Sequence, residues 1–468
     1  MLPMQFPAQT AWTAQVLFPD LVLGDERRDR RFEAVVRAIA ENPGASLPQL
    51  FPKPSDYNAC LRLFDSPHCT HAEILGAHQE ATLNAMERHA GVVLLIHDAT
   101  TLDFSGHATL EDDLGEIGNG GGTGWISHQT LAVDPKTRQA FGLVSQILHV
   151  RETAAKGESV AAKRNRKSRE SLLWPRGLDE IGPSPADAHW IDVCDRGADV
   201  FEFLQQLADR KRRFVVRSTH NRALGSDRSD AKSEELLHDR LRALPATTRW
   251  ELEIPMKTGK SKRTARLSAA AGRFELRPPH VKTGNYRDEA VTANAVRIWE
   301  AEPPPGVEAL EWILLTNEPI ETPEQLREAV GFYECRMQIE EFHKVQKSGA
   351  QVEGCQVQST TKMAAFVAVL SVVSVAMLNL RLAIRDPRTA ARPAEEFVPA
   401  AWVEVLRRYR GGPKKAWTVR DFWVELARLG GYQKNPLKNP PGWITLWRGW
   451  QTLQPLIRYH QLSMAEMS

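Results

Sequence analysis

The sequence predicts an α/β protein whose central sheet is flanked by helical regions at both ends of the chain. Two apolar runs of strand length, 92–96 and 190–194, have the composition of strands buried on both faces. The regions before about residue 90 and after about residue 386 instead space their apolar residues as helices do. A chain of 468 residues is long enough for two or three domains around a sizeable core.

The N-terminal region is predicted to be a small helical domain. Asp25 can cap a helix whose apolar face consists of Phe32, Val35, Val36 and Ile39. The first turns of this helix carry four arginines, namely Arg27, Arg28, Arg30 and Arg31. Such arginines form either a solvated helix face or the phosphate and groove contacts of a DNA-binding domain. The pattern alone leaves both interpretations open.

Asp98 is the first candidate catalytic acid, because it lies where the predicted strand 92–96 emerges from the core. A single aspartate in this place is often only a turn or capping residue. The functional alternative is a carboxylate that binds a metal ion at the edge of the sheet. Asp103, Asp112 and Asp113 follow in the chain, but they lack the strand-end setting.

Asp195 is the second candidate acid, because it closes the predicted strand 190–194. Asp192 lies inside that strand and Asp199 lies about one turn into the helix that follows, so both are alternatives. A further strand is predicted at 214–218, and it carries Arg217.

Between the two aspartates, 125–133 and 140–150 are predicted to pair as strands. The run 163–169 then holds five cations in seven residues. A run of this kind is usually exposed to solvent, and beside a DNA channel it would hold phosphate.

From about 226 to 319 the pattern changes to short alternating strands, which predicts a β insertion in the catalytic domain. The strands are expected at 250–254, 267–269, 274–276 and 291–298, with a basic loop between the first two that carries Lys257, Lys260, Lys262, Arg263 and Arg266. The strand 311–316 returns to the core and carries Trp312, which composition alone would place in the interior.

The segment 333–347 predicts a helix with a charged face, since it has long side chains and neither glycine nor proline. At about 100° per residue, one side of this helix carries Tyr333, Arg336, Glu340, Lys344 and Lys347. Spacings of three and four residues also produce ordinary surface ion pairs. The functional alternative is a carboxylate that holds a metal while its neighbours bind phosphate oxygens. Glu341 lies further round the helix.

The apolar run 363–378 is short for a membrane span and contains two serines, so it predicts a buried core helix. The region after it is helical and rich in tryptophan. Trp443, Trp447 and Trp450 share one helix face and form either a local core or a dimer contact.

The overall composition excludes some classes of site. Basic and acidic residues number 60 and 58, so any DNA-binding surface has to be local. The five cysteines include no Cys-x-x-Cys pair, which indicates a reduced cytosolic protein without a zinc ribbon or disulfide frame. Two aspartates and a glutamate offer hard oxygen ligands, which favour Mg²⁺ or Mn²⁺ over Zn²⁺.

The order Tyr333, Arg336, Glu340, Lys347, together with the string Ile339 to Lys344, resembles a known signature. It is that of the cut-and-paste DDE transposases of bacterial insertion sequences, the group that includes the Tn-five transposase. The contexts of Asp98 and Asp195 resemble the first and second aspartate motifs of this family, and 23–28 resembles its N-terminal start. The resemblance covers nearly the whole chain.

The resemblance implies a ribonuclease-H-like catalytic core over 76–385, interrupted by the β insertion. It also implies a DNA-binding domain over 1–75 and a dimerisation domain over 386–468. Asp98, Asp195 and Glu340 would hold two Mg²⁺ ions, with Mn²⁺ as a substitute and Asp98 shared between them. The partners would be double-stranded DNA, both transposon ends and target, and a second copy of the chain, with no membrane. The place of action would be the cytoplasm of a bacterium, at the nucleoid.

The resemblance also gives roles to the remaining candidate residues. Arg336, Lys344 and Lys347 would neutralise phosphates, and Tyr333 would donate a hydrogen bond to one. Arg217 would contact the cleaved end, Met337 would push a base out of the stack, and Trp312 would be the platform for that base. The expected reaction proceeds by nicking, hairpin formation, hairpin opening and strand transfer. Two alternatives stay open, a metal nuclease of the same core and a non-catalytic DNA-binding relative.

Overall fold

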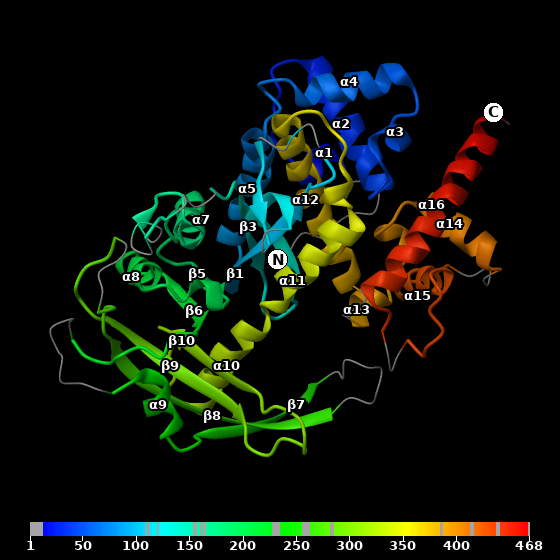
Figure 1. Cartoon of the computed structure of the whole chain (residues 1–468). Helices are drawn as coiled ribbons and strands as arrows, with labels where there is room; N and C mark the ends of the chain where they lie inside the picture. Colours follow the sequence, from blue (N-terminus) through cyan, green and yellow to red (C-terminus); the bar gives the residue numbers. More distant parts are fainter. Residues whose placement is uncertain are drawn as a thin grey trace.

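A computed structural model gives the fold of the chain. It describes residues 13–466 except for 108–109, 111–112, 119–120, 153–156, 160–161, 163–164, 227–234, 255–262, 281–284, 384–386, 412–415 and 437–439. Part of the cation run 163–169 and most of the predicted basic loop lie outside these residues. Figure 1 shows a large mixed sheet with the helices of the N-terminal region above it and those of the C-terminal region to its right, so the predicted α/β class with helical flanks is confirmed.

The N-terminal region is helical, as predicted. Its helices are α1 (Ala14–Leu17), α2 (Glu26–Glu41), α3 (Leu47–Leu50), α4 (Pro54–Phe64) and α5 (His71–Glu87). Asp25 caps α2, because its carboxylate accepts hydrogen bonds from the backbone N–H groups of Arg27 and Arg28 at 2.8 and 3.0 Å. The predicted apolar face of α2 is buried.

One ten-stranded sheet forms the centre of the molecule. Its order is β2-β3-β1-β5-β6-β10-β9-β8-β7, and β4 pairs with β3 off this path. The strands are β1 (Val92–Asp103), β2 (Gly115–Ile117), β3 (Gly122–Val133), β4 (Ala140–His149), β5 (His189–Cys194), β6 (Arg213–Arg217), β7 (Thr248–Ile254), β8 (Arg263–Leu276), β9 (Val291–Glu300) and β10 (Glu311–Thr316). β1 pairs antiparallel with β3 and parallel with β5, which places the two candidate aspartates on neighbouring strands.

Side-chain alternation divides the core into two layers on opposite faces of the sheet. Leu94, Ile96, Ile191 and Val193 belong to a cluster that contains α10 (Pro323–Glu334), α11 (Met337–Lys344) and α12 (Thr360–Ala383). Cys194, with the opposite parity, packs with α7 (Leu173–Ile181) and α8 (Phe201–Asp209). Figure 1 shows α7 and α8 apart from α10 to α12, on the other side of the strands. The first face is therefore the one on which a helical glutamate can meet a strand aspartate.

The structure corrects three sequence expectations about elements. The pairing of β1 with β3 continues to Asp103, so Asp98 lies inside a strand and not at its end. What ends near Asp98 is the parallel neighbour β5, whose pairing stops at His97↔Cys194. The strands expected at 267–269 and 274–276 are one strand, β8, since β9 pairs with it along its length. The insertion also contains a helix, α9 (Leu237–Arg242), that alternation did not indicate.

The helix expected at 333–347 is interrupted. α10 ends at Glu334, α11 begins at Met337, and a π-helical turn, η4 (Val345–Gly349), follows directly. Cys335 and Arg336 keep right-handed helical backbone angles, so the direction of the chain changes little across the break. Gln351 then adopts a left-handed conformation with φ 49° before the short turn η5 (Val352–Gly354). π-Helical turns of this kind often mark functional sites.

The apolar helix α12 packs inside the protein. Within the described residues, its segment Thr360–Asn379 is the one helix long and apolar enough to cross a membrane, and most of that segment is buried inside the molecule. This agrees with the prediction of a core helix.

The C-terminal region contains α13 (Pro387–Ala390), α14 (Ala400–Arg410), α15 (Val419–Leu429) and α16 (Trp443–Glu466). Two of the three predicted stripe tryptophans, Trp447 and Trp450, are 9% and 7% exposed. The Trp450 ring meets Trp402 of α14 edge to face at 4.4 Å. This favours the local-core interpretation for those two residues. The side chain of Trp443 lies outside the described residues.

Candidate active site

Asp98, Asp195 and Glu340 line one cavity of about 470 Å³, although they come from a strand, a strand end and a helix. Asp98 shares the side-chain parity of Leu94 and Ile96, so its carboxylate faces the layer that contains α11. Asp195 directly follows β5, and its Oδ1 accepts a hydrogen bond from the backbone N–H of Gly197 at 2.9 Å. This bond caps a 3₁₀ turn, η3 (Arg196–Ala198), and fixes the carboxylate.

Arg336 links the strand acid to the helix acid. Its Nη1 donates to Asp98 Oδ2 at 3.0 Å, and its Nη2 donates to Glu340 Oε1 at 2.7 Å. The Glu340 side chain is 41% exposed, whereas that of Asp98 is 14% exposed. Glu341 is bound elsewhere, because its oxygens accept from Arg381 and from Lys344. Of the two adjacent glutamates, Glu340 is therefore the one available to the cavity.

The cavity is cationic around its acids. Three carboxylates line it, while five cationic side chains surround them: Arg196, Arg217, Arg336, Lys344 and Lys347. The difference of two positive charges favours a polyanion over a neutral or cationic ligand. All the residues predicted to share one helix face line this cavity together, namely Tyr333, Arg336, Glu340, Lys344 and Lys347.

Burial and, to a lesser extent, the nearby charge of Asp195 together raise the pKa of Asp98 to about 6, against the opposing charge of Arg336. Burial removes the carboxylate from water, and a second carboxylate nearby makes its negative charge less stable still. Burial likewise raises the pKa of Tyr333, and Arg336 and Arg217 oppose that shift. Tyr333 therefore keeps its phenolic proton at neutral pH and can act as a hydrogen-bond donor.

The donors of this cavity fit a divalent metal ion. Asp98, Asp195 and Glu340 offer hard carboxylate oxygens, and a cation would relieve the like-charge repulsion that raises the Asp98 pKa. Among the described residues, no three Asp, Glu, His or Cys side chains are placed to hold one ion together. A Mg²⁺ ion held by one or two of these carboxylates would be completed by water or substrate oxygens. An ion between Asp98 and Glu340 would replace Arg336 as their partner.

Two of the side chains predicted to bind phosphate form ion pairs within the protein. Lys344 is paired with Glu341 at 2.9 Å, and Lys347 is paired with Glu353 at 3.2 Å. Both are partly exposed pairs, which contribute little and exchange readily. Met337 is 50% exposed on the first turn of α11, so an apolar side chain projects from this helix into solvent.

Asp199 positions the loop that follows Arg217. It is 1% exposed, and its Oδ2 accepts from the backbone N–H groups of Thr219 and His220 at 2.7 and 2.9 Å. Its Oδ1 accepts from Arg222 at 2.5 Å. All its acceptor capacity is used inside the protein, so this alternative to Asp195 is a structural residue.

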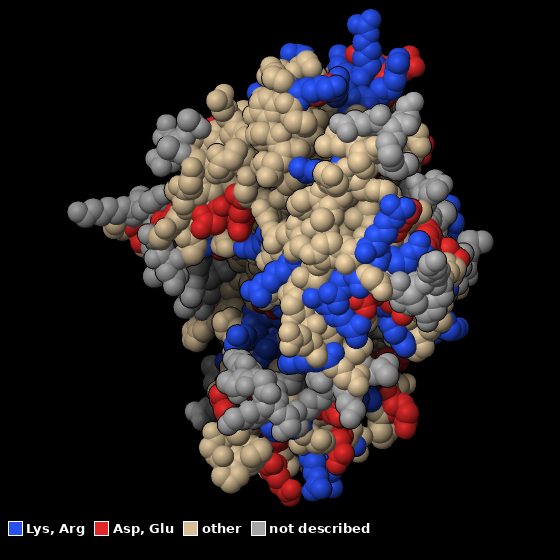
Figure 2. All heavy atoms as spheres, turned by 90° about the vertical axis from the view of Figure 1, so that its right-hand side faces the viewer, with Lys and Arg blue, Asp and Glu red and all other residues tan. Residues whose placement is uncertain are grey.

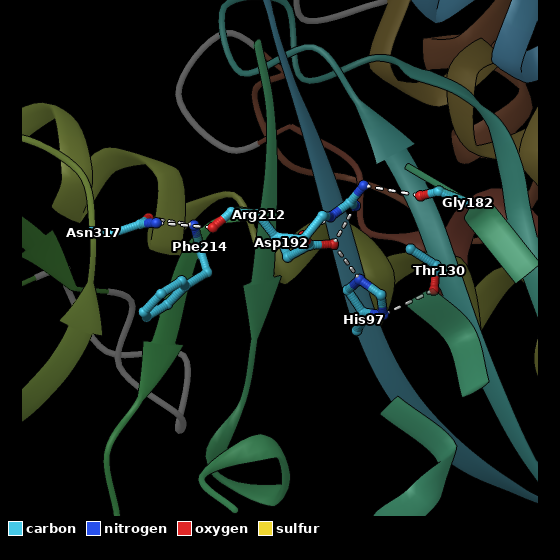
Figure 3. A network of polar contacts seen from close by, with 7 residues as sticks. All are labelled: His97, Thr130, Gly182, Asp192, Arg212, Phe214 and Asn317. Atoms are coloured by element: carbon cyan, nitrogen blue, oxygen red, sulfur yellow. Dashed lines mark hydrogen bonds and ion pairs between the residues drawn. The ribbon is translucent and has the colours of Figure 1, made fainter. Parts of the chain in front are cut away.

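Asp192, the other alternative, is buried in a polar network behind the site (Figure 3). Arg212 donates to both of its oxygens, at 2.7 and 2.9 Å, and His97 Nε2 lies 2.9 Å from Oδ1. Thr130 on β3 contacts the other ring nitrogen of His97 at 3.0 Å. The network joins β1, β3 and β5 immediately behind Asp98, and Asp192 itself does not line the cavity.

Trp312 lies on β10, partly exposed, and packs against the cluster that contains α10 and α11. It has the same parity as Leu314, whose partner across the sheet is Arg217. Trp312 does not line the cavity itself. It lies on the same sheet face as Arg217, so the position fits either of the two interpretations.

The four N-terminal arginines divide into two groups. Arg28 donates to the backbone carbonyl of Leu23 at 2.6 Å, and Arg31 pairs with Asp56 at 3.2 Å. Arg27 and Arg30 are exposed on the same helix. Figure 2 shows Lys and Arg side chains at the top, over the N-terminal helices, and again across the middle of the molecule.

His343 is a cavity residue to which the sequence gave no role. It is 9% exposed, lies one turn after Glu340, and its Nε2 is buried without a hydrogen-bond partner in the described structure. Burial, together with the charges of Lys347 and Arg336, lowers its pKa to about 3. The sequence places His343 on the charged helix, but it does not indicate whether the side chain lines a cavity as a neutral ring or lies in the core.

The fold and the cavity thus define an α/β protein with an acidic centre inside a cationic pocket. Residues 9–69 match the family model described as transposase DNA-binding. The match spans α1 to α4 and falls within the predicted N-terminal domain. It supports a transposase that binds DNA through this region.

Proposed function

We propose that the chain is a DDE transposase that cuts DNA at the ends of a mobile element and joins the freed 3′ ends to target DNA. The observation that carries the proposal is the meeting of Asp98, Asp195 and Glu340 at one cavity with five cations around it. The N-terminal match to a transposase DNA-binding family adds the second function that such an enzyme needs. The pairing of β1 with both β3 and β5 supports a ribonuclease-H-like core.

Two Mg²⁺ ions bound by Asp98, Asp195 and Glu340 would supply an activated oxygen nucleophile and a stabilised leaving oxygen. The residues of the chain orient the scissile phosphate. Arg336, Lys344 and Lys347 neutralise its oxygens, and Tyr333 donates a hydrogen bond from its neutral hydroxyl. Arg217, whose loop Asp199 anchors, binds the neighbouring cleaved end.

The reaction begins when water attacks the phosphorus and the bond to the 3′ oxygen breaks, which leaves a 3′ hydroxyl. That hydroxyl attacks the opposite strand and forms a hairpin, and a second water opens the hairpin. The same hydroxyl then attacks a phosphate of the target, so each new P–O bond replaces one that breaks. Exposed Met337 displaces a base during hairpin formation, and Trp312 stacks on it.

A cleavage assay on the inverted repeats that flank the gene tests the assignment. Asp98→Asn, Asp195→Asn and Glu340→Gln should each abolish Mg²⁺-dependent cleavage and leave end binding intact. Glu341→Gln is the matched control, because Glu341 is bound to Arg381 and Lys344. Substantial cleavage by Glu340→Gln, or loss of cleavage in the control only, would show that the wrong glutamate has been assigned.

Two further assays separate the alternatives. Cleavage without joining of 3′ ends to a target plasmid would indicate a metal nuclease with the same core. End binding without any cleavage would indicate a non-catalytic relative. We place the active form in the bacterial cytoplasm at the nucleoid, as a homodimer that pairs two ends.

A further inference from the structure

A second groove lies directly beside the active-site cavity. It also has a volume of about 470 Å³, and Lys347 and Ser348 line both hollows. One wall is the irregular segment after the catalytic helix, which includes Gln351. The other wall is the first part of α16, with Ile444, Arg448 and Gln451. The groove therefore leads from the candidate active-site cavity to the C-terminal helix α16.

The polar groups of the groove are available to a ligand. Arg448 is exposed and forms no ion pair with another described residue, while Lys347 has one partly exposed partner, Glu353. The exposed amides of Gln351 and Gln451 form no hydrogen bond in the described part of the chain. Two cations and two amides along one path suit a backbone phosphate and the polar edges of a base.

The apolar part of the groove is exposed on one side and rigidly supported on the other. Ile444 is 66% exposed, so its apolar side chain is accessible to a ligand in the groove. Trp447 is supported from behind by Gly44, where a Cβ atom would lie 2.7 Å from the Trp447 ring and from the carbonyl oxygen of Gly349. Because Gly44 also has φ +78°, no other residue suits that turn. The tryptophan edge is thus fixed in place.

We propose that this groove binds one unpaired DNA strand that continues past the scissile phosphate. Arg448 binds its next phosphate, Ile444 and the edge of Trp447 contact a base, and Gln351 and Gln451 bind polar edges. The volume suits one or two nucleotides and is too small for a duplex, and stacking with phosphate contacts is the usual way of holding single strands. The inference rests on the proposed function for the identity of the ligand as DNA.

Binding of end duplexes without divalent metal tests the groove, since no cleavage then intervenes. One probe ends at the cleavage position, and two others carry four extra unpaired nucleotides on one strand or the other. Arg448→Glu should weaken binding of one flanked probe about tenfold or more and lower its salt-dependence slope by about one. Binding of the unflanked probe should not change. Arg420→Glu is the matched control, as an exposed arginine on α15 outside the groove.

A further arm identifies the source of the strand. If Arg448→Glu weakens the binding only of a separate single strand added to the unflanked complex, the groove does not hold the strand that continues past the scissile phosphate, and the inference is overturned. Equal binding by Arg448→Glu and the native protein in every arm would overturn the inference. So would photocrosslinks from 5-iodouracil in the first two flanking nucleotides that map outside 444–451.

These experiments distinguish a failure of the groove proposal from a failure of the proposed function. Loss of flanked binding in Arg448→Glu, combined with no cleavage by the native protein in Mg²⁺, would keep the groove and reject the catalytic proposal. Normal cleavage together with an unaffected Arg448→Glu would keep the catalytic proposal and reject the groove.

Discussion

Arg336 donates a hydrogen bond to Asp98 across 3.0 Å, although 238 residues separate the two in the chain. The same guanidinium binds Glu340 at 2.7 Å. Arg336 therefore supplies a positive charge to both carboxylates. If the proposed metal ions bind to these carboxylates, they compete with Arg336, and a phosphate oxygen would then be the new partner of the released arginine.

Arg336→Ala should raise the affinity for metal while it lowers activity. Without the guanidinium, Asp98 and Glu340 repel each other, so Ca²⁺ or Mn²⁺ should bind about tenfold more tightly and raise the melting temperature more than in the native protein. Cleavage should fall roughly tenfold to hundredfold, because a charged contact to phosphate is lost. Lys344→Ala is the control for metal affinity, since Lys344 pairs with Glu341 and not with Asp98 or Glu340. An unchanged metal-induced shift in melting temperature would contradict this account.

Asp192→Asn should destabilise the fold strongly. Burial alone would raise the pKa of Asp192, but Arg212 and His97 outweigh burial and lower it to about 2. The amide would leave Arg212, itself 2% exposed, without a buried counter-charge, at a cost of about 3–5 kcal/mol. Asp209→Asn, which removes an exposed partner of Arg287, should cost less than about 1 kcal/mol. Urea unfolding of both variants measures the difference, and equal midpoints would refute the prediction.

The contribution of Asp192 should also disappear in acid. Its folded-state pKa lies below its ordinary value of 3.8, so the stabilisation is complete above about pH 4 and is lost as pH falls toward 2. The acid limb of the unfolding curve should be weaker in Asp192→Asn than in the native protein.

His78 should make the free energy of unfolding depend on pH between pH 7 and pH 5. Its Nδ1 donates to the carbonyl of Leu17 at 2.9 Å, and its Nε2 accepts from the backbone N–H of Leu143 at 3.1 Å, so the ring must be neutral. Burial lowers its pKa from 6.5 to about 4. Protons therefore bind the unfolded state preferentially, and stability should fall by about 2 kcal/mol between pH 7 and pH 5 from this group.

Urea unfolding at pH 7 and pH 5 tests the role of His78. His78→Gln should be less stable at pH 7 but should lose less on acidification than the native protein. His68→Gln changes an exposed histidine and should behave as the native protein does. If His78→Gln loses as much stability as the native protein, another histidine controls this range.

The strands and the helix that carry the candidate acids were predictable, because local sequence patterns determine them. A doubly buried strand needs a continuous apolar run, so 92–96 and 190–194 were recognisable, as was the helical character of 333–347. The extension of β1 beyond Asp98 was not predictable, because the strand there is held only by β3 on one side. Composition cannot show that a residue pairs on one edge only.

The roles of individual polar residues depended on contacts between distant segments. Asp192 and Asp199 differ from Asp195 only in what surrounds them, namely Arg212 for one and Arg222 with a loop backbone for the other. Likewise, Glu341 differs from Glu340 because Arg381 reaches it from α12. The groove beside Lys347 needs α16, which lies about a hundred residues further along the chain.

We now expect the dimer contact on a different face of α16 from the tryptophan stripe. Trp450 is packed on Trp402, so Trp450→Ala should lower stability by about 3–5 kcal/mol and leave the pairing of ends intact once the protein is folded. Tyr459 and Leu462, one turn apart on α16, are 75% and 66% exposed and could meet a second copy of the chain. Replacing both with Ser should reduce the paired-end complex in native gels while single-end binding survives. If Trp450→Ala alone removes pairing, the stripe itself is the contact.

Trp312 allows a sharper test of the hairpin step. The residue lies on the sheet face of Arg217 and is only partly buried, so it can meet a base displaced from the stack. Bending two strands into a hairpin costs a few kcal/mol of unstacking, and a platform recovers part of that cost only at this stage. Trp312→Ala should therefore spare the first nick and slow hairpin formation. A stacking loss of about 1–3 kcal/mol corresponds to roughly a fivefold to hundredfold change in rate.

Trp299→Ala is the matched control for Trp312, because Trp299 lies on the neighbouring strand and its ring is already covered by Arg297 at 4.3 Å. An abasic site at the displaced position should reduce the deficit of Trp312→Ala, since little stacking is then left to lose. If Trp312 is only a core residue, Trp312→Ala should slow nicking and hairpin formation equally, as Trp299→Ala would. The abasic site should then not restore the rate of hairpin formation.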